Sequence, residues 1–323
     1  MLKYITAAML PSLLFVSCQK NSKDLQDDSA QEGIVALLQD LTVEVQRTEA
    51  NQTRTTPRQA SFQLLSFAIA RAGLANELNN PNFAYTLFAP TDDAFTAMGL
   101  GTKQAINQVA VQDLKAILLY HVLGSKVMAA QVPTTYTELT MLSNQQAYII
   151  RNNAGVFING TPVVSADIAA KAGVIHAIDR VLMPPAGNLV QVAAANPNFS
   201  YLVAAVQRAG LVTALSALGP LTVFAPTNQA FIDAGFTTIA SIEAAPPSAL
   251  IPILTYHVYA GRAFSSDLSN GQMLAMLSGG TTTILLTNGA QIDGANSAPS
   301  NIIQTDVMAT NGVIHAIDRV LLP

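Results

Sequence analysis

The chain has 323 residues, of which 50% are apolar and 11% are charged, and its formal net charge is −4. This length allows two ordinary domains with real cores, and the apolar content excludes disorder over most of the chain. The sequence contains no cluster of Lys and Arg that could neutralise a row of phosphates, which excludes nucleic acid as an expected partner. We expect no cofactor, because the chain has neither a Gly-rich phosphate loop nor a Cys-x-x-Cys-His motif.

The N-terminus predicts a signal peptide over residues 1–17. Lys3 precedes an apolar stretch that is too short to span a bilayer. The stretch ends in LFVSC, which resembles a bacterial lipobox, although Phe15 replaces the usual Leu. We therefore expect lipidation of Cys18 and attachment to the outer membrane or cell surface of a bacterial envelope. The alternative is a plain secretory signal with an incidental cysteine. Cys18 is the single cysteine, so no disulfide is expected.

Residues 18–57 predict a lipidated cysteine followed by a polar tether. The segment 19–33 is polar and has no apolar period, and 51–57 is rich in Thr and Asn. Between them, residues 34–45 could form a short amphipathic helix.

The rest of the chain is an internal repeat. Four strings recur in the same order, with offsets of 136 to 139 residues between the copies, so a whole domain is duplicated. We place the domains at 58–185 and 187–323. The paired strings are SFQLLSFAIARAGL (61–74) and NFSYLVAAVQRAGL (198–211), TLFAPTDDAF (86–95) and TVFAPTNQAF (222–231), LLYHVLG (118–124) and LTYHVYA (254–260), and GVIHAIDRVL at 173–182 and again at 312–321.

These strings contain signals for the ends of helices and strands. Apolar residues recur at helical spacing over 62–74, and Gly73 and Gly210 predict left-handed helix stops. TLFAP and TVFAP predict short strands, and Thr91 and Thr227 then stand where a helix N-cap belongs.

The second half of each copy predicts strands. Segments 147–160 and 281–294 are typical of hairpins with glycine at the turn. GVIHAIDRVL is rich in β-formers and apolar at adjacent positions, which favours a strand covered on both faces. Because helices come first and strands later, the predicted class is α+β rather than a doubly wound parallel sheet.

The order F-A-P-T-x-x-A-F, then Tyr-His, then G-V-I-H-x-I-D-R-V-L resembles the fasciclin domain, in both copies. The resemblance implies two tandem domains, each a β-sandwich-like wedge flanked by several helices. It also implies non-enzymatic adhesion to an extracellular glycan or to a matrix or cell-surface protein. The short linker 184–187 predicts that the two copies are held close together.

The resemblance implies candidate adhesion residues in two places of each copy. The first copy keeps the Asp-Ile pair, whereas the second copy has Asp306-Val307 in its place. The alternative is that the Tyr and His side chains belong to the core and that the Asp caps a turn. The candidates are Tyr120, His121, Asp167 and Ile168 in the first copy, and Tyr256, His257, Asp306 and Val307 in the second.

The second histidine of each copy raises the question of a metal or catalytic site. His176 precedes Asp179 by three residues, as His315 precedes Asp318. Two His and a carboxylate can bind a divalent ion where they converge, but residues three apart on a strand point to opposite faces. No Ser or Cys nucleophile recurs beside them. We therefore expect structural histidines and no metal. A metal-dependent or carbohydrate-processing enzyme remains the alternative, and an open cleft that groups these side chains would favour it.

Overall fold

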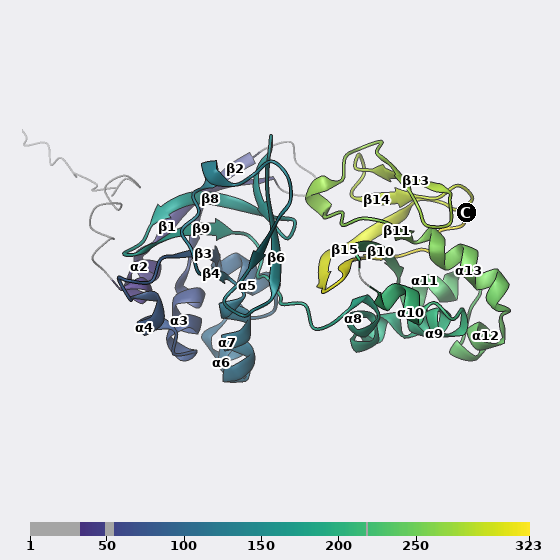
Figure 1. Cartoon of the computed structure of the whole chain (residues 1–323), viewed down its shortest axis with the longest axis horizontal. Helices are drawn as coiled ribbons and strands as arrows, with labels where there is room; N and C mark the ends of the chain where they lie inside the picture. Colours follow the sequence, from purple (N-terminus) through teal and green to yellow (C-terminus); the bar gives the residue numbers. More distant parts are fainter. Residues whose placement is uncertain (1–32, 49–54, 218) are drawn as a thin grey trace, which may run out of the picture.

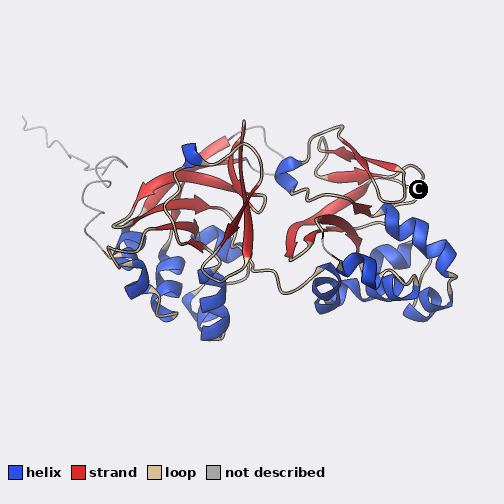
Figure 2. Ribbon diagram, in the orientation of Figure 1, coloured by secondary structure: helices blue, strands red, loops and turns tan. Residues whose placement is uncertain are grey.

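The computed structural model describes residues 33–48, 55–217 and 219–323. The chain forms two domains that follow one another along its long axis (Figure 1). We call 33–182 the first domain and 189–323 the second domain. Figure 2 shows that most helices of each domain gather on one side of its strands.

The first domain contains a helical layer, a two-stranded hairpin and a seven-stranded sheet. Its elements in chain order are α2 (Ile34–Asp40), β1 (Thr42–Thr48), β2 (Thr55–Ser61), α3 (Gln63–Arg71), α4 (Ala75–Leu78), β3 (Tyr85–Pro90), α5 (Asp92–Ala97), α6 (Lys103–Gln108), α7 (Val111–Leu119), β4 (Val122–Leu123), η1 (Ala129–Gln131), β5 (Thr137–Thr140), β6 (Gln146–Asn152), β7 (Gly155–Ile158), β8 (Thr161–Ala169) and β9 (Gly173–Ile178).

The second domain repeats this order, without the hairpin. Its elements are α8 (Leu189–Ala195), η2 (Pro197–Phe199), α9 (Ser200–Arg208), α10 (Val212–Ser216), β10 (Leu221–Pro226), α11 (Asn228–Asp233), α12 (Ile239–Ala244), α13 (Pro247–Tyr256), β11 (Val258–Tyr259), η3 (Ser265–Asp267), β12 (Met273–Ala275), β13 (Thr281–Leu285), β14 (Gln291–Asp293), β15 (Ser300–Ala309) and β16 (Gly312–Ile317).

Each seven-stranded sheet curls almost into a barrel. The strand order is β4-β3-β9-β8-β7-β6-β5 in the first domain, and the second domain has the corresponding order. Strands β3 and β9 are parallel, whereas the other neighbours are antiparallel. An isolated bridge between Leu123 and Met141 joins the two edges of the sheet. The predicted α+β class is confirmed, and the wedge is one sheet curled on itself.

Two cores lie on opposite faces of each sheet. Successive side chains of a strand point to opposite faces, so β3 and β9 contribute to both cores and are buried along their whole length. The expectation of a strand covered on both faces is confirmed. The core under the helices includes Leu65, Ile69, Leu87, Phe95 and Ile175, and the core inside the curled sheet includes Phe88, Tyr120, Ile149, Ile158 and Ile178.

The predicted helix ends are present in both copies. The Thr91 hydroxyl accepts a hydrogen bond from the backbone N–H of Ala94, and Thr227 caps the corresponding helix. Gly73 and Gly210 have φ values of 72° and 70°, the left-handed conformation that ends a helix.

The structure differs from the predicted tether in the segment before residue 58. Helix α2 is followed by β1, which pairs antiparallel with β2 over seven residues. Leu37, Leu38 and Val43 are buried in the first core, so α2 and β1 belong to the first domain. Cys18 and residues 19–32 lie outside the described residues.

Among the described residues, no single helix is long and apolar enough to cross a membrane. Helix α8 and the segment η2–α9 reach that length and composition only as a pair, and they are bent by 109°. Leu189 and Leu202 of this pair are buried in the core of the second domain.

Candidate functional site

The tyrosines of the Tyr-His pairs are core residues. Tyr120 and Tyr256 are fully buried inside the two curled sheets. The Tyr120 hydroxyl donates to the carbonyl of Gln146 at 2.7 Å, and the Tyr256 hydroxyl donates to the carbonyl of Thr281 at 2.6 Å. These side chains are buried in the folded protein, which is the placement expected of core residues rather than of residues in direct contact with a ligand.

The neighbouring histidines are buried as well, and each joins two distant parts of its domain. His121 Nδ1 lies 2.8 Å from the carbonyl of Ile117, and its Nε2 accepts the backbone N–H of Leu182 at 2.9 Å. His257 makes the same contacts with Ile253 and Leu321. One ring nitrogen donates and the other accepts, which defines a neutral imidazole. The placement of these two side chains also agrees with the alternative of a core role.

Burial keeps these two rings uncharged. It lowers the pKa of His121 to about 4, and the hydrogen bond to Ile117 offsets the shift only in part. The pKa of His257 is lowered to about 4 for the same reasons.

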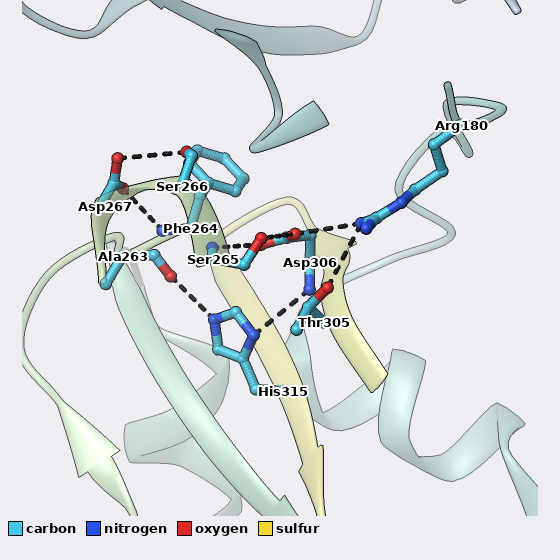
Figure 3. Close-up of polar contacts among 9 residues, drawn as sticks. All are labelled: Arg180, Ala263, Phe264, Ser265, Ser266, Asp267, Thr305, Asp306 and His315. Carbon is cyan, nitrogen blue, oxygen red and sulfur yellow. Dashed lines mark hydrogen bonds and ion pairs between the residues drawn. The ribbon is translucent and has the colours of Figure 1, made fainter. Parts of the chain in front are cut away.

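The second histidine of each copy holds a loop against a bulged strand. His315 Nδ1 accepts the backbone N–H of Asp306 at 3.4 Å, and its Nε2 lies 2.9 Å from the carbonyl of Ala263 (Figure 3). His176 contacts Asp167 and Val127 in the same way. Both rings are buried, and burial lowers the pKa of each. The predicted structural role of these histidines is thus visible in their contacts.

The candidate aspartates stand at the bulges of β8 and β15. Asp167 and Asp306 have φ values of 59° and 61°, a left-handed conformation that is uncommon outside glycine. Asp167 Oδ1 accepts the backbone N–H of Ala129 at the start of η1, and Asp306 Oδ1 accepts that of Ser265 at the start of η3. Each carboxylate therefore fixes a 3₁₀ helix next to its bulge.

The residues after these aspartates pack inward. Ile168 is partly buried against the core under the helices of the first domain, and Val307 occupies the same place in the second. Their apolar side chains therefore contribute to the cores of the two domains.

The His and Asp side chains of GVIHAIDRVL do not form a shared site. Asp179 and Asp318 follow the last residue of their strands, and Asp318 accepts hydrogen bonds from Ser300 and from the backbone N–H of Asn301. Among residues 33–48, 55–217 and 219–323, no three His, Cys, Asp or Glu side chains come together in a group that could hold a metal ion.

The two domains meet through an aromatic cluster that sequence reasoning missed. Phe264, in the loop before η3, is fully buried and packs against Tyr136 and Tyr148 of the first domain, with ring centroids 5.4 Å and 6.4 Å away. The Tyr136 hydroxyl donates to Asp267 at 2.5 Å. The Arg262 guanidinium lies 3.9 Å from the centroid of the Tyr148 ring, a cation–π contact.

An ion pair completes the contact between the domains. Arg180 extends from the first domain and donates to Asp306 Oδ2 at 3.1 Å (Figure 3). The Arg180 side chain is 47% exposed, whereas that of Asp306 is 1% exposed. The second-domain aspartate is thus covered by the first domain. The sequence gives one signal for the contact between the domains, namely a difference between the two copies. The second copy has Arg262 and Phe264 at this contact, whereas the first copy has Lys126 and Met128 at the corresponding positions.

Replacing Gly160 with alanine should loosen the contact between the domains. An added Cβ would lie 2.9 Å from both the Asp306 carboxyl and the Phe264 Cβ, across the interface. We expect small-angle X-ray scattering to show a larger radius of gyration for Gly160→Ala. The matched control is Gly73→Ala, which has a similar φ but no neighbouring atom within 4 Å. Unchanged scattering from a folded Gly160→Ala protein would contradict this contact.

Comparison with known proteins finds the same domain in both halves of the chain. The Fasciclin domain model matches residues 60–184 and 197–323. Protein sll1483 of Synechocystis sp. is 39% identical over 168 residues, which cover 52% of this chain and 91% of that protein. Transforming growth factor-beta-induced protein ig-h3 of Sus scrofa is 30% identical over 252 residues, which cover 77% of this chain and 36% of ig-h3.

More distant similarities extend to other animal proteins. Periostin of Homo sapiens is 25% identical over 252 residues, covering 74% of this chain and 28% of periostin. A FAS1 domain pair from the insect cell adhesion molecule fasciclin I gives a TM-score of 0.40 at 18% identity, covering 81% of this chain and 96% of that chain. The chain thus spans well under two thirds of the length of ig-h3 or periostin. Because the family model matches two segments that together exceed half of its length, the chain belongs to the fasciclin domain family.

Proposed function

We propose that this chain is a cell-surface adhesion protein that binds an extracellular glycan or a matrix or cell-surface protein without enzymatic turnover. The observation that carries the proposal is the presence of two complete fasciclin domains in one chain. Fasciclin domains occur in cell adhesion proteins, and fasciclin I is a cell adhesion molecule by name. A tandem of such domains suits attachment to a repetitive surface.

The contacts of the histidines support binding rather than catalysis. A metal-dependent or carbohydrate-processing enzyme would need the repeated His and Asp side chains in one accessible cleft. All four histidines are buried instead, and both ring nitrogens of each lie within hydrogen-bonding distance of the backbone. The ring nitrogens therefore hydrogen-bond to the backbone and hold loops and strands of each domain together.

The two candidate aspartates differ in their contacts, which favours the first domain as the ligand-binding copy. Asp306 pairs with Arg180 of the other domain, whereas Asp167 accepts a hydrogen bond from Ala129 of its own domain. The first copy also keeps the Asp-Ile pair. We propose that a ligand reaches the first domain at Asp167 and that Asp306 serves the contact between the domains.

The proposal is tested by surface binding. The purified chain is passed over immobilised matrix proteins, polysaccharides and whole bacterial cells, and it is also incubated with sugar and ester substrates. Saturable binding without product formation supports adhesion. Turnover of a substrate together with the absence of binding to any surface would favour the enzyme alternative.

We further propose attachment to the bacterial envelope through a lipid on Cys18. Replacing Cys18 with serine removes the thiol that the lipid would modify, so the protein should leave the membrane fraction and lose fatty-acid labelling. Ser17→Ala, which keeps a small residue before the cysteine, is the matched control and should stay labelled. A Cys18→Ser protein that remains in the membrane fraction with unchanged mass would show that the lipobox prediction is wrong.

A further inference from the structure

The chain contains four asparagines that are followed directly by glycine, namely Asn159, Asn270, Asn288 and Asn311. In such a pair the backbone nitrogen of the glycine can attack the side-chain amide carbon of the asparagine, because glycine has no Cβ to hinder the approach and rotates freely about its backbone bonds. The reaction consumes only water. Which of the four pairs can react therefore depends on how the fold holds each of them.

Two of these asparagines are held in the interior. Asn159 is 3% exposed, its Oδ1 accepts the backbone N–H of Tyr148, and its Nδ2 donates to the Tyr120 hydroxyl. Asn311 is 7% exposed, its Oδ1 accepts the backbone N–H of Leu189, and its Nδ2 donates to two backbone carbonyls. Attack by the glycine would break these buried hydrogen bonds, which is costly. The fold therefore protects both pairs.

The third pair is restrained by hydrogen bonds. Asn270 Oδ1 accepts the backbone N–H of Leu286 at 2.8 Å. The backbone N–H of Gly271, which would be the nucleophile, donates to the carbonyl of Ile284 at 2.8 Å. Because both reacting groups are engaged, this pair should react slowly.

The fourth pair, Asn288-Gly289, is exposed in the turn between β13 and β14 (Figure 1). The Asn288 side chain has no hydrogen-bond partner among the residues that the structure describes. Gly289 has a φ of 93°, and apart from its chain neighbours no atom lies within 4 Å of the place that a Cβ would take. The turn therefore has room to bring the glycine nitrogen to the asparagine side chain.

We propose that Asn288 is a site of spontaneous deamidation, which adds a negative charge to the second domain. The Gly289 nitrogen forms a bond to Cγ of Asn288 while the bond from Cγ to the amide nitrogen breaks, and the proton of the glycine N–H leaves with that nitrogen as ammonia. Water then opens the resulting succinimide ring. Cleavage of the new bond gives aspartate. Cleavage of the original peptide bond gives isoaspartate, whose backbone runs through Cβ and Cγ, and either product carries a carboxylate.

The modified turn should leave the fold intact. Ile284 and Ile292 pair with one another on β13 and β14, and both are fully buried inside the curled sheet of the second domain. The new charge and the extra backbone atom of isoaspartate lie beyond these anchors, at the surface. The modification thus changes the charge of an exposed hairpin, and it does not depend on the proposed adhesive function.

The first domain supplies an internal control for the test. Its corresponding hairpin, between β6 and β7, has an exposed asparagine, Asn153, that is followed by Ala154. The folded chain is incubated at mildly alkaline pH, and mass spectrometry of its peptides locates each amide that has become an acid. We expect conversion at Asn288 to be roughly tenfold or more faster than at Asn153, because the alanine side chain hinders the attack. Asn159 and Asn311 should keep their amides in the folded chain and lose them once the chain is unfolded in urea.

Isoelectric focusing of variants gives a second readout. The aged wild-type chain should gain an acidic band that aligns with freshly prepared Asn288→Asp. Asn288→Gln, whose longer side chain forms a cyclic imide far more slowly, should not gain this band, whereas the matched control Asn153→Gln should gain it as the wild-type chain does. Asn288→Asp should unfold in urea at the wild-type midpoint.

An Asn288 amide that persists, or that converts no faster than Asn153, would overturn the proposal. So would an acidic band that Asn288→Gln gains at the wild-type rate. A lower urea midpoint for Asn288→Asp would contradict the expectation that the fold tolerates the new charge.

Discussion

Both domains should lose stability as the pH falls from about 6.5 to about 4, because each contains a Tyr-His histidine that is buried without charge. In the unfolded chain these histidines take up a proton near pH 6.5. In the folded protein the pKa of His121 and of His257 is lowered to about 4, chiefly by burial.

The sign of the effect follows from these two values. A histidine whose folded pKa is depressed contributes its full stability above the unfolded pKa, and this contribution is lost as the pH falls toward the folded pKa. A shift of this size corresponds to a loss of about 3 kcal/mol for each histidine. Protonated Nε2 of His121 would also face the N–H of Leu182, so two donors would meet where a hydrogen bond now exists. His176 and His315 have lowered pKa values as well and add to the loss.

The measurement is urea unfolding of the whole chain at a series of pH values. His121→Gln and His257→Gln should each be less stable at neutral pH, since an optimised pair of hydrogen bonds is lost. Each variant should also show a smaller drop toward acid, and only in the transition of its own domain. If the free energy of unfolding of the wild-type chain stays constant between neutral pH and the pKa of about 4, these histidines are not buried in a neutral form.

Structural features that depend on a few consecutive residues could be predicted from the sequence. The N-cap at Thr91, the left-handed stop at Gly73 and the doubly buried strand GVIHAI each depend on local backbone preferences or on continuous apolarity. The duplication reinforced these signals, because each occurs twice in the same order. The fold class and the tandem arrangement followed from them.

The membership of the N-terminal segment in the first core was not predictable in this way. The sequence predicted a short amphipathic helix over 34–45, but α2 ends at Asp40 and the chain continues as strand β1. Strand β1 is held in the first domain because it pairs with β2 and because its Val43 packs in the first core. These are tertiary contacts, which the sequence of the segment itself does not contain.

The role of the histidines was ambiguous for a related reason. The same residue types line active sites and satisfy buried backbone groups, and the choice depends on what lies opposite each ring. For His121 the partner is the N–H of Leu182, 61 residues away. The domain contact is still less local, because Tyr136 and its partner Asp267 are 131 residues apart. The short linker predicted that the domains lie close together, but only the residues that differ between the copies gave a sign of which side chains make the contact.

The second large effect that we expect is a gain in binding from the tandem. If both domains contact a repetitive ligand, the whole chain should bind it on the order of 10² to 10⁴ times more tightly than either domain alone. The structure changes the design of the fragments. A first fragment that begins at residue 58 would lack α2 and β1, whose side chains belong to the first core, so the fragments are 33–185 and 187–323.

The direct contact between the domains makes this gain depend on geometry. Two sites held at a fixed separation gain most when the ligand repeats at a matching distance, and they gain less when the connection becomes loose. Gly160→Ala, which should open the contact, is therefore expected to weaken binding of the whole chain to a polymeric surface while leaving the affinity of fragment 33–185 unchanged. Gly73→Ala should leave the tandem advantage intact. Surface binding of the two fragments, the whole chain and both variants to cells, polysaccharides and matrix proteins measures all of these effects. Equal affinity of fragment 33–185 and the whole chain would mean that the second domain supplies no site and that its role is to support the first.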